Sequence, residues 1–167
     1  QMVGLLFPSD FVGRIAARRS DCDATAATDV TLCMFERRGF DQILKKTPNL
    51  EHRLLEMTLD ELDATREWLV LLGRKSAKEK VASFLCVLAR RLGKHADADG
   101  EVAVRIPITR EDMADYLGLT IETVSRQMSA LKREELIALD DARDIRILDL
   151  PALTEVSGED SEGGMVP

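Results

Sequence analysis

The chain has 167 residues, a length that fits one domain with an appendage or two small domains. Its net charge of −7 argues against tight non-specific binding of nucleic acid, although fourteen basic and fourteen acidic side chains balance within residues 74–150 and allow a basic face there. Three cysteines, an odd number, with no signal peptide and no apolar run long enough to span a membrane, predict a protein of the reducing cytoplasm without a disulfide framework.

Short strands and one short helix are predicted in the first part of the chain. Residues 2–13 have the pattern of two strands joined by a Pro-Ser-Asp turn, and Thr28–Glu36 has the pattern of a further strand. Phe40–Lys46 is predicted to form a helix that ends before Pro48.

A long amphipathic helix is predicted from Asn49 to Leu72. Small or apolar residues recur along it at the a and d positions of a coiled coil, and a second apolar stripe can pack within the chain. The pattern by itself leaves open whether the first stripe joins two parallel copies of the helix or belongs to an intramolecular core. The expected dimer seam consists of Leu55, Thr58, Leu62, Thr65, Leu69 and Leu72.

A hinge at Gly73 follows, and Ser76 with Glu79 can form a capping box on a helix that runs to Leu92. Later expected elements are a polar loop (93–101), a strand (103–108), a wing hairpin (137–139 and 145–148) and a disordered tail (157–167).

The most informative segment precedes the wing and predicts a helix-turn-helix. Thr109 and Asp112 can form a capping box on a short first helix, and Gly118 allows the left-handed turn after it. The second helix is expected to face inward through Ile121, Val124, Met128 and Leu131. The polar residues near its start suit the base edges of a major groove. The expected DNA-binding residues are Thr120, Glu122, Thr123, Ser125, Arg126 and Ser129.

The segment Leu117-Gly-Leu-Thr-Ile-Glu-Thr-Val-Ser-Arg126 resembles the recognition element of the CRP/FNR family of bacterial transcription regulators, and of its FNR branch in particular. The resemblance implies that Glu122, Ser125 and Arg126 read TTGAT half-sites. Arginine can donate to guanine O6 and N7, glutamate can accept from the cytosine amino group, and serine is a short adaptable contact. The resemblance extends over nearly the whole chain. It implies that residues 2–13 and 28–36 are late strands of the family's β-roll sensor, whose first half lies outside this chain.

The resemblance also raises the question of what the sensor detects. A cyclic nucleotide is not expected, because Arg19-Ser-Asp-Cys-Asp23 places carboxylates where family members hold the phosphate. In the oxygen-sensing branch, three N-terminal cysteines and one central cysteine hold a [4Fe–4S] cluster. Cys33 occupies the central place and is the expected ligand, with the other ligands outside this chain; a buried strand cysteine is the alternative. Cys86 is expected in the core, and the role of Cys22 is left open.

These observations predict a mainly α-helical protein with small β elements. The expected parts are the end of a β-roll sensor (1–47), a dimerisation helix (48–73), a winged helix-turn-helix (74–156) and a tail (157–167). No catalytic constellation is visible, since His52 and His95 lack metal-ligand spacing.

The expected function is oxygen- or redox-responsive control of anaerobic metabolism genes at TTGAT-N4-ATCAA-like palindromes. The protein would act as a cytoplasmic homodimer, with double-stranded DNA and RNA polymerase as partners and no membrane association. Two alternatives remain open: a FixK-like regulator of the same family without a cluster, and a protein–protein adaptor that docks through its helix-turn-helix.

Overall fold

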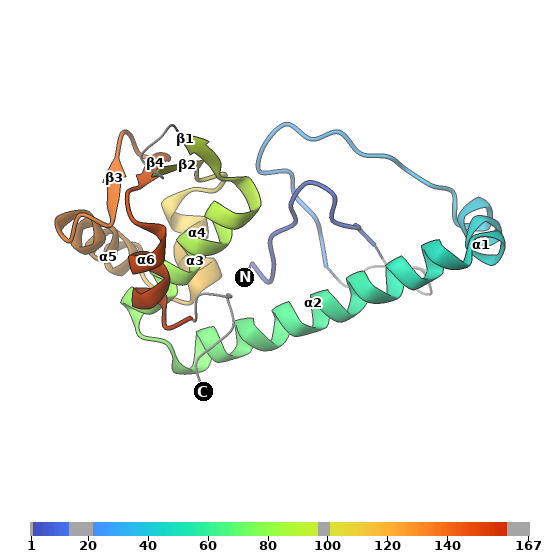
Figure 1. Ribbon diagram of the computed structural model, residues 1–167, viewed down its shortest axis with the longest axis horizontal. Helices are drawn as coiled ribbons and strands as arrows, with labels where there is room; N and C mark the ends of the chain where they lie inside the picture. Colours follow the sequence, from blue (N-terminus) through green and yellow to red (C-terminus); the bar gives the residue numbers. More distant parts are fainter. Residues whose placement is uncertain (1, 14–21, 97–100, 160–167) are drawn as a thin grey trace. The chain divides into compact units, whose positions relative to one another are not determined.

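The computed structural model of the protein describes residues 2–13, 22–96 and 101–159. The chain divides into two compact units, which we call the long-helix unit (residues 10–69) and the winged-helix unit (residues 1–9 and 70–167). The helices are α1 (Arg37–Lys46), α2 (Pro48–Arg74), α3 (Ala77–Leu92), α4 (Arg110–Leu117), α5 (Ile121–Arg133) and α6 (Leu150–Ser157) (Figure 1). The strands are β1 (Lys94–Ala96), β2 (Glu101–Arg105), β3 (Ile137–Leu139) and β4 (Asp144–Ile147). The expected fold class, mainly helical with a small β component, is confirmed.

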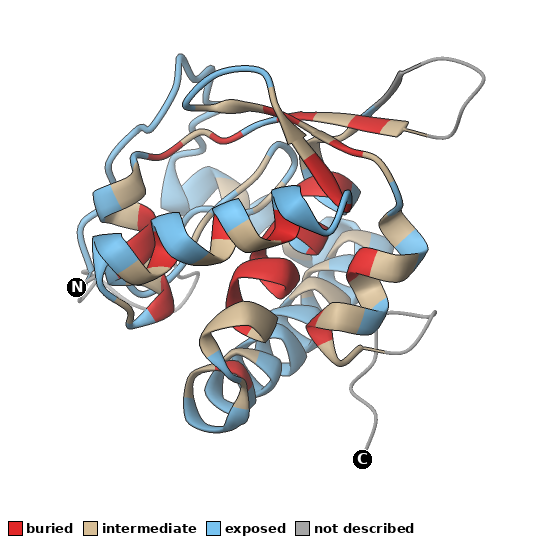
Figure 2. Ribbon diagram, turned by 90° about the vertical axis from the view of Figure 1, so that its left-hand side faces the viewer, coloured by how far each residue is buried: buried red, intermediate tan, exposed pale blue. Residues whose placement is uncertain are grey.

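The four strands form one antiparallel sheet in the order β1-β2-β4-β3. Val104 pairs with Ile145 across β2 and β4, and Leu139 pairs with the same residue from the other side. Side chains alternate between the two faces of a strand, and the inward ones, such as Val102 and Ile147, are buried. The sheet therefore closes one side of a helical core, where most buried residues lie (Figure 2).

Helix α3 forms the centre of that core. Its capping box is present as predicted, because the Ser76 hydroxyl accepts from the Glu79 N–H while the Glu79 carboxylate accepts from the Ser76 N–H. Val81, Leu85 and Leu88 are fully buried, so one face of α3 packs into the core. Burial of such a face contributes more to the stability of a helix than its intrinsic propensity does.

The predicted strands at residues 2–13 and Thr28–Glu36 are not present. Neither segment contains a strand among the described residues, and residues 8–9 form a turn. A strand gains its stability from a neighbour that bonds its backbone, and the described chain provides no such neighbour here. The β-roll therefore stays an expectation that this structure does not reproduce.

Three smaller differences concern the winged-helix unit. Strand β2 covers residues 101–105 rather than 103–108, since Pro107 has no N–H with which to continue the ladder. Strand β1 forms where only a loop was expected, and α6 forms just before the expected tail. Of that tail, residues 160–167 lie outside the described residues. Among the described helices, none combines the length and apolar character needed to cross a membrane.

Candidate nucleic-acid interface

The helix-turn-helix begins with the predicted capping box on α4. The backbone N–H of Asp112 donates to Thr109 Oγ1 over 3.1 Å, and the N–H of Thr109 donates to Asp112 Oδ2 over 3.1 Å. The Thr109 hydroxyl also donates to Asp112 Oδ2 over 2.7 Å. The two bonds that the Asp112 carboxylate accepts, from the Thr109 hydroxyl and the Thr109 N–H, hold its pKa below the ordinary value. The first turn of α4 is thus fixed by its own sequence.

The turn between α4 and α5 depends on Gly118. Its backbone is left-handed, with φ 61° and ψ 42°, and the following N–H of Leu119 donates to the Ala114 carbonyl over 2.9 Å. From α3, the buried Lys80 donates through Nζ to the Leu117 carbonyl over 3.4 Å. A cation at a helix C-terminus is favourable for the helix dipole. Sequence patterns gave no sign of this lysine contact, because its partner lies on another helix.

The apolar side of helix α5 packs into the core of the winged-helix unit. Val124, Met128 and Leu131 are all buried, as predicted, and the Thr120 hydroxyl caps the helix by accepting from the Thr123 N–H over 3.2 Å. The prediction that Ile121 faces inward is wrong, since 44% of this residue is exposed. It lies in the first turn of α5, where it borders an open hollow instead of the closed core.

The polar face of α5 points away from the core. Glu122, Ser125, Arg126 and Ser129 are exposed, as the sequence predicted. The pKa of the Glu122 carboxyl lies below its ordinary value because the carboxylate accepts from its own backbone N–H and from the Thr120 hydroxyl. Glu122 therefore stays an anionic acceptor that is held near the start of the helix.

Thr120 and Thr123, also expected to bind DNA, are engaged with each other. Thr120 Oγ1 lies 3.1 Å from Thr123 Oγ1, and it also caps the helix by accepting from the Thr123 N–H. Thr123 is half-buried, whereas Thr120 is exposed. Both side chains thus serve the start of α5 in the free protein.

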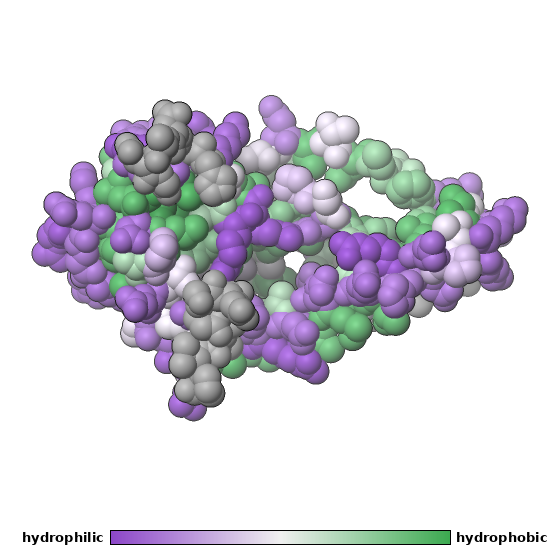
Figure 3. Space-filling model, in the orientation of Figure 1, coloured by the Kyte–Doolittle hydropathy of each residue, from purple (hydrophilic) through white to green (hydrophobic). Residues whose placement is uncertain are grey.

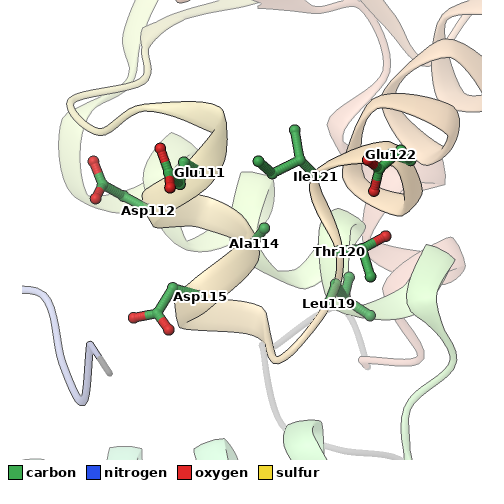
Figure 4. A pocket seen from close by; sticks show the side chains of 8 residues that line it. All are labelled: Glu111, Asp112, Ala114, Asp115, Leu119, Thr120, Ile121 and Glu122. Carbon is green, nitrogen blue, oxygen red and sulfur yellow. The ribbon is translucent and has the colours of Figure 1, made fainter.

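A hollow with a volume of about 570 Å³ lies between α4 and the start of α5 (Figure 4). Carboxylates surround it, and those in its lining are Glu111, Asp112, Asp115 and Glu122. Four negative groups around one hollow repel a phosphate. A nucleic-acid backbone is therefore expected to pass outside it.

Arginines on the wing sheet are paired with carboxylates. Arg105 lies 3.0 Å from Asp144, and Arg146 lies 2.8 Å from Glu101 and 3.2 Å from Asp140. The hydrogen bonds to Asp140 and Glu101 raise the pKa of Arg146 above its ordinary value. These cations do not present an uncompensated positive charge to DNA. The sequence showed the mixture of charges here but not the pairing.

The predicted seam on α2 is largely uncovered. Leu55, Leu62 and Leu69 are 56%, 45% and 64% exposed, and apolar side chains lie at the surface along one edge of α2 (Figure 3). The hydroxyls of Thr58 and Thr65 donate to carbonyls one turn earlier in the same helix, each over 2.8 Å.

The threonine hydroxyls of the seam therefore have partners within their own helix. The remaining seam position, Leu72, is half-buried at the end of α2. Within the described chain, the three exposed leucines do not belong to an intramolecular core.

The cysteines do not come together. Cys22 and Cys33 are exposed, whereas Cys86 is buried, with its sulfur 3.7 Å from Thr154 Oγ1. Burial raises the pKa of the Cys86 thiol, which confirms its expected place in the core. No group of three potential metal ligands occurs among the described residues, so these residues do not fit a four-thiolate cluster on their own. In the described chain Cys33 is exposed and outside any strand, so the structure does not reproduce the alternative of a buried strand cysteine.

Known proteins share the sequence pattern and the fold of this chain. The model of the Crp-like helix-turn-helix domain matches residues 79–156. Among individual proteins, the chain is similar to the transcriptional activator protein FnrL of Cereibacter sphaeroides, with 54% identity over 167 residues, which is 99% of this chain and 67% of that protein. It is also similar to the nitrogen fixation regulation protein FixK of Bradyrhizobium diazoefficiens, with 42% identity over 83% of this chain and 58% of that protein.

The fold is similar to a solved structure as well. The structure of FixK2 from Bradyrhizobium japonicum superposes with a TM-score of 0.65 and 34% identity, over 75% of this chain and 60% of that chain. The chain spans between 58% and 67% of the length of the two relatives named above.

Proposed function

Since the chain belongs to the CRP/FNR family of transcription regulators, in its FNR/FixK-like branch, we propose that it binds specific double-stranded DNA sequences and regulates transcription. The observation that carries this proposal is the division of α5 into two faces. Its apolar face is buried in the winged-helix unit, and its opposite face exposes Glu122, Ser125 and Arg126. A helix whose apolar face is anchored in its domain can place its exposed face in a major groove.

The proposed base contacts follow from the chemistry of these three side chains. Arg126 donates to O6 and N7 of a guanine, Glu122 accepts from the amino group of a cytosine, and Ser125 makes a short adaptable contact. Ser129 lies one turn further along the same exposed face. Thr120 and Thr123 act chiefly by fixing the start of the helix, which supports Glu122 through the Thr120 hydroxyl.

The proposed target is a palindrome of the TTGAT-N4-ATCAA type, bound by a homodimer. The exposed Leu55, Leu62 and Leu69 support a parallel seam along α2, because a soluble helix rarely leaves such a stripe in water. Two copies joined in this way present two recognition helices to two half-sites. RNA polymerase is the further partner that this role requires.

A binding titration tests the proposal against the adaptor alternative. We expect tight binding of a labelled TTGAT palindrome, weaker binding of a scrambled duplex of the same length, and a fall in affinity for both as salt rises. Equal affinity for the two duplexes at every salt concentration would show that the helix-turn-helix does not read sequence. The adaptor interpretation would then be favoured.

An oxygen-responsive role is a further part of the proposal, and it concerns Cys33. We propose this exposed thiol as one ligand of a [4Fe–4S] cluster in a protein that supplies the other thiolates outside this chain. Iron and sulfide content of that longer protein, prepared without oxygen, should fall sharply in Cys33→Ala and stay unchanged in Cys86→Ala, whose thiol is buried in the core. A Cys33→Ala variant with normal iron would remove this residue from the site. A parent protein without iron would favour the FixK-like alternative.

A further inference from the structure

The core of the winged-helix unit contains a lysine without a carboxylate partner. Lys80 on α3 is only 9% exposed. Among the described residues, its Nζ has one hydrogen-bond acceptor, the Leu117 carbonyl at 3.4 Å, and no ion pair. Lysine is rarely buried to this extent without a group that compensates its charge.

Two neighbouring lysines of the same unit are compensated in the usual way. Lys75 lies 3.4 Å from Glu159, and Lys78 lies 2.7 Å from Glu134. In the described chain, Lys80 instead has only the dipole of one carbonyl. An ammonium has three donors, so a single acceptor leaves most of its hydrogen-bonding capacity unused and its burial costly. Packing alone therefore does not explain a lysine at this position.

The acceptor of Lys80 is the last carbonyl of α4. The final carbonyls of a helix have no partner within the helix and need a donor from elsewhere. In α4, the Ala114 carbonyl accepts from the Leu119 N–H, whereas the Leu117 carbonyl accepts from Lys80. The ammonium also lies at the negative end of the helix dipole. Lys80 therefore satisfies the end of α4 directly before the turn at Gly118.

A second contact from α3 reaches the same end of α4. Phe84 lies one turn after Lys80, and its ring packs edge-on against the ring of Tyr116, with 5.9 Å between the centroids and 64° between the planes. Residues four apart on a helix share one face. One face of α3 therefore contacts the last two residues of α4, Tyr116 and Leu117, through an aromatic ring and a cation.

We propose that Lys80 is a positioning residue for DNA reading, which fixes where α4 ends and thereby how α5 presents Glu122 and Arg126. The proposal rests on the proposed function. Only residues 118–120 lie between Leu117 and the start of α5, so a shift at the end of α4 reaches α5 through a short connection (Figure 4). Hydrogen bonds to base edges depend steeply on distance and angle, so a small shift weakens them.

Amide hydrogen exchange of the full chain, followed by NMR, tests the link between Lys80 and the turn without DNA. Lys80→Met keeps a long apolar stem and leaves no buried charge, so the unit should stay folded. We expect the Leu119 N–H to exchange about tenfold faster in Lys80→Met, because loss of a bond from a charged donor loosens the turn. Lys80→Arg should restore most of the protection, since a guanidinium can donate to the same carbonyl. The amide of Leu88, in the core of α3, should be unchanged in both variants.

Binding titrations with the labelled TTGAT palindrome and the scrambled duplex test the consequence for DNA. We expect Lys80→Met to lower the ratio of the two affinities about tenfold, and Lys80→Arg to restore it. The salt dependence should stay the same, because a buried ammonium does not contact a phosphate. Lys78→Met is the matched control: it removes the same charge from the same helix, and it should keep the ratio of the parent.

A folded Lys80→Met with an unchanged affinity ratio would overturn the proposal, whether or not Leu119 exchanges faster. An equal loss of affinity for both duplexes would also overturn it, because Lys80 would then contribute only to general electrostatic attraction. Unfolding of Lys80→Met in circular dichroism would make the lysine a stability element and not a positioning residue. If the parent bound both duplexes equally, the proposed function would fail, and the exchange of Leu119 alone would decide whether Lys80 fixes the turn.

Discussion

Replacing Gly118 with alanine should destabilise the winged-helix unit through backbone strain alone. This glycine forms the turn between α4 and α5 with φ 61° and ψ 42°. In that left-handed conformation the Cβ of an L-amino acid approaches its own carbonyl, at a cost of about 1–2 kcal/mol. The neighbours add nothing to this cost, because an added Cβ would lie 3.7 Å from Leu72 Cδ2, an ordinary van der Waals distance.

The expected loss translates into a measurable shift in melting temperature. For a domain of about 60–100 residues, each kcal/mol lowers the midpoint by about 4–8 °C. Asparagine tolerates the left-handed region better than alanine, so Gly118→Asn should lie between the parent and Gly118→Ala. Thermal unfolding followed by far-UV circular dichroism gives the order of the three midpoints.

Gly73→Ala provides a matched control elsewhere in the chain. Gly73 lies in the last turn of α2 without a positive φ, and nothing lies within 4 Å of an added Cβ. Alanine there should stabilise the helix by about 0.5–1 kcal/mol, the opposite sign. Equal midpoints for Gly118→Ala and the parent would refute the argument that this turn requires a left-handed residue. A loss far above the strain estimate would instead indicate a packing defect.

Three further predictions concern DNA recognition, assembly and acid stability. Arg126→Ala should cost about 1–3 kcal/mol per contact in binding titrations and relax discrimination at one guanine per half-site; an equal loss on all sequences would identify a phosphate contact. Leu62→Asp should dissociate the dimer in analytical sedimentation, because it brings two carboxylates together in an apolar seam; an unchanged dimer would rule out that seam. Because bonds from the Ser76 side chain and backbone lower the pKa of Glu79, its stabilising effect is complete above the ordinary carboxyl pKa and is lost as pH falls through the lowered value. Urea midpoints measured on acidification should therefore fall less steeply in Ser76→Ala than in the parent, and identical slopes would contradict this assignment.

Local patterns predicted the helix-turn-helix well because its determinants are short-range. The capping box at Thr109 and the left-handed Gly118 each depend on residues within one or two turns, and both were confirmed. Helix α6 carried the same kind of signal, with Asp149 as its N-cap, a proline in its first turn and Gly158 at its C-terminus, and these signals would have predicted it.

The features that the sequence could not predict depend on contacts between residues that lie far apart in the chain. The segment ending at Glu36 has the composition of a strand, but a strand requires a neighbour and the described chain offers none. The contact between Lys75 and Glu159 joins residues 84 positions apart, so no periodicity indicates it. Ile121 is likewise exposed because it borders the hollow between α4 and the start of α5. Helical spacing alone, which predicted it to be buried, does not show this hollow.

The pairing of arginines with carboxylates on the wing bears on how quickly such a protein searches a chromosome. Arg105 and Arg146 must exchange a carboxylate for a phosphate before they can contribute to DNA binding. They therefore add little to the affinity for DNA of random sequence. Residence times on wrong sites would then be short, and the protein would return rapidly to solution or to a neighbouring position. Under the proposed function, discrimination between sites would then depend on a few base contacts from α5, and the broad electrostatic attraction that slows release elsewhere would be weak.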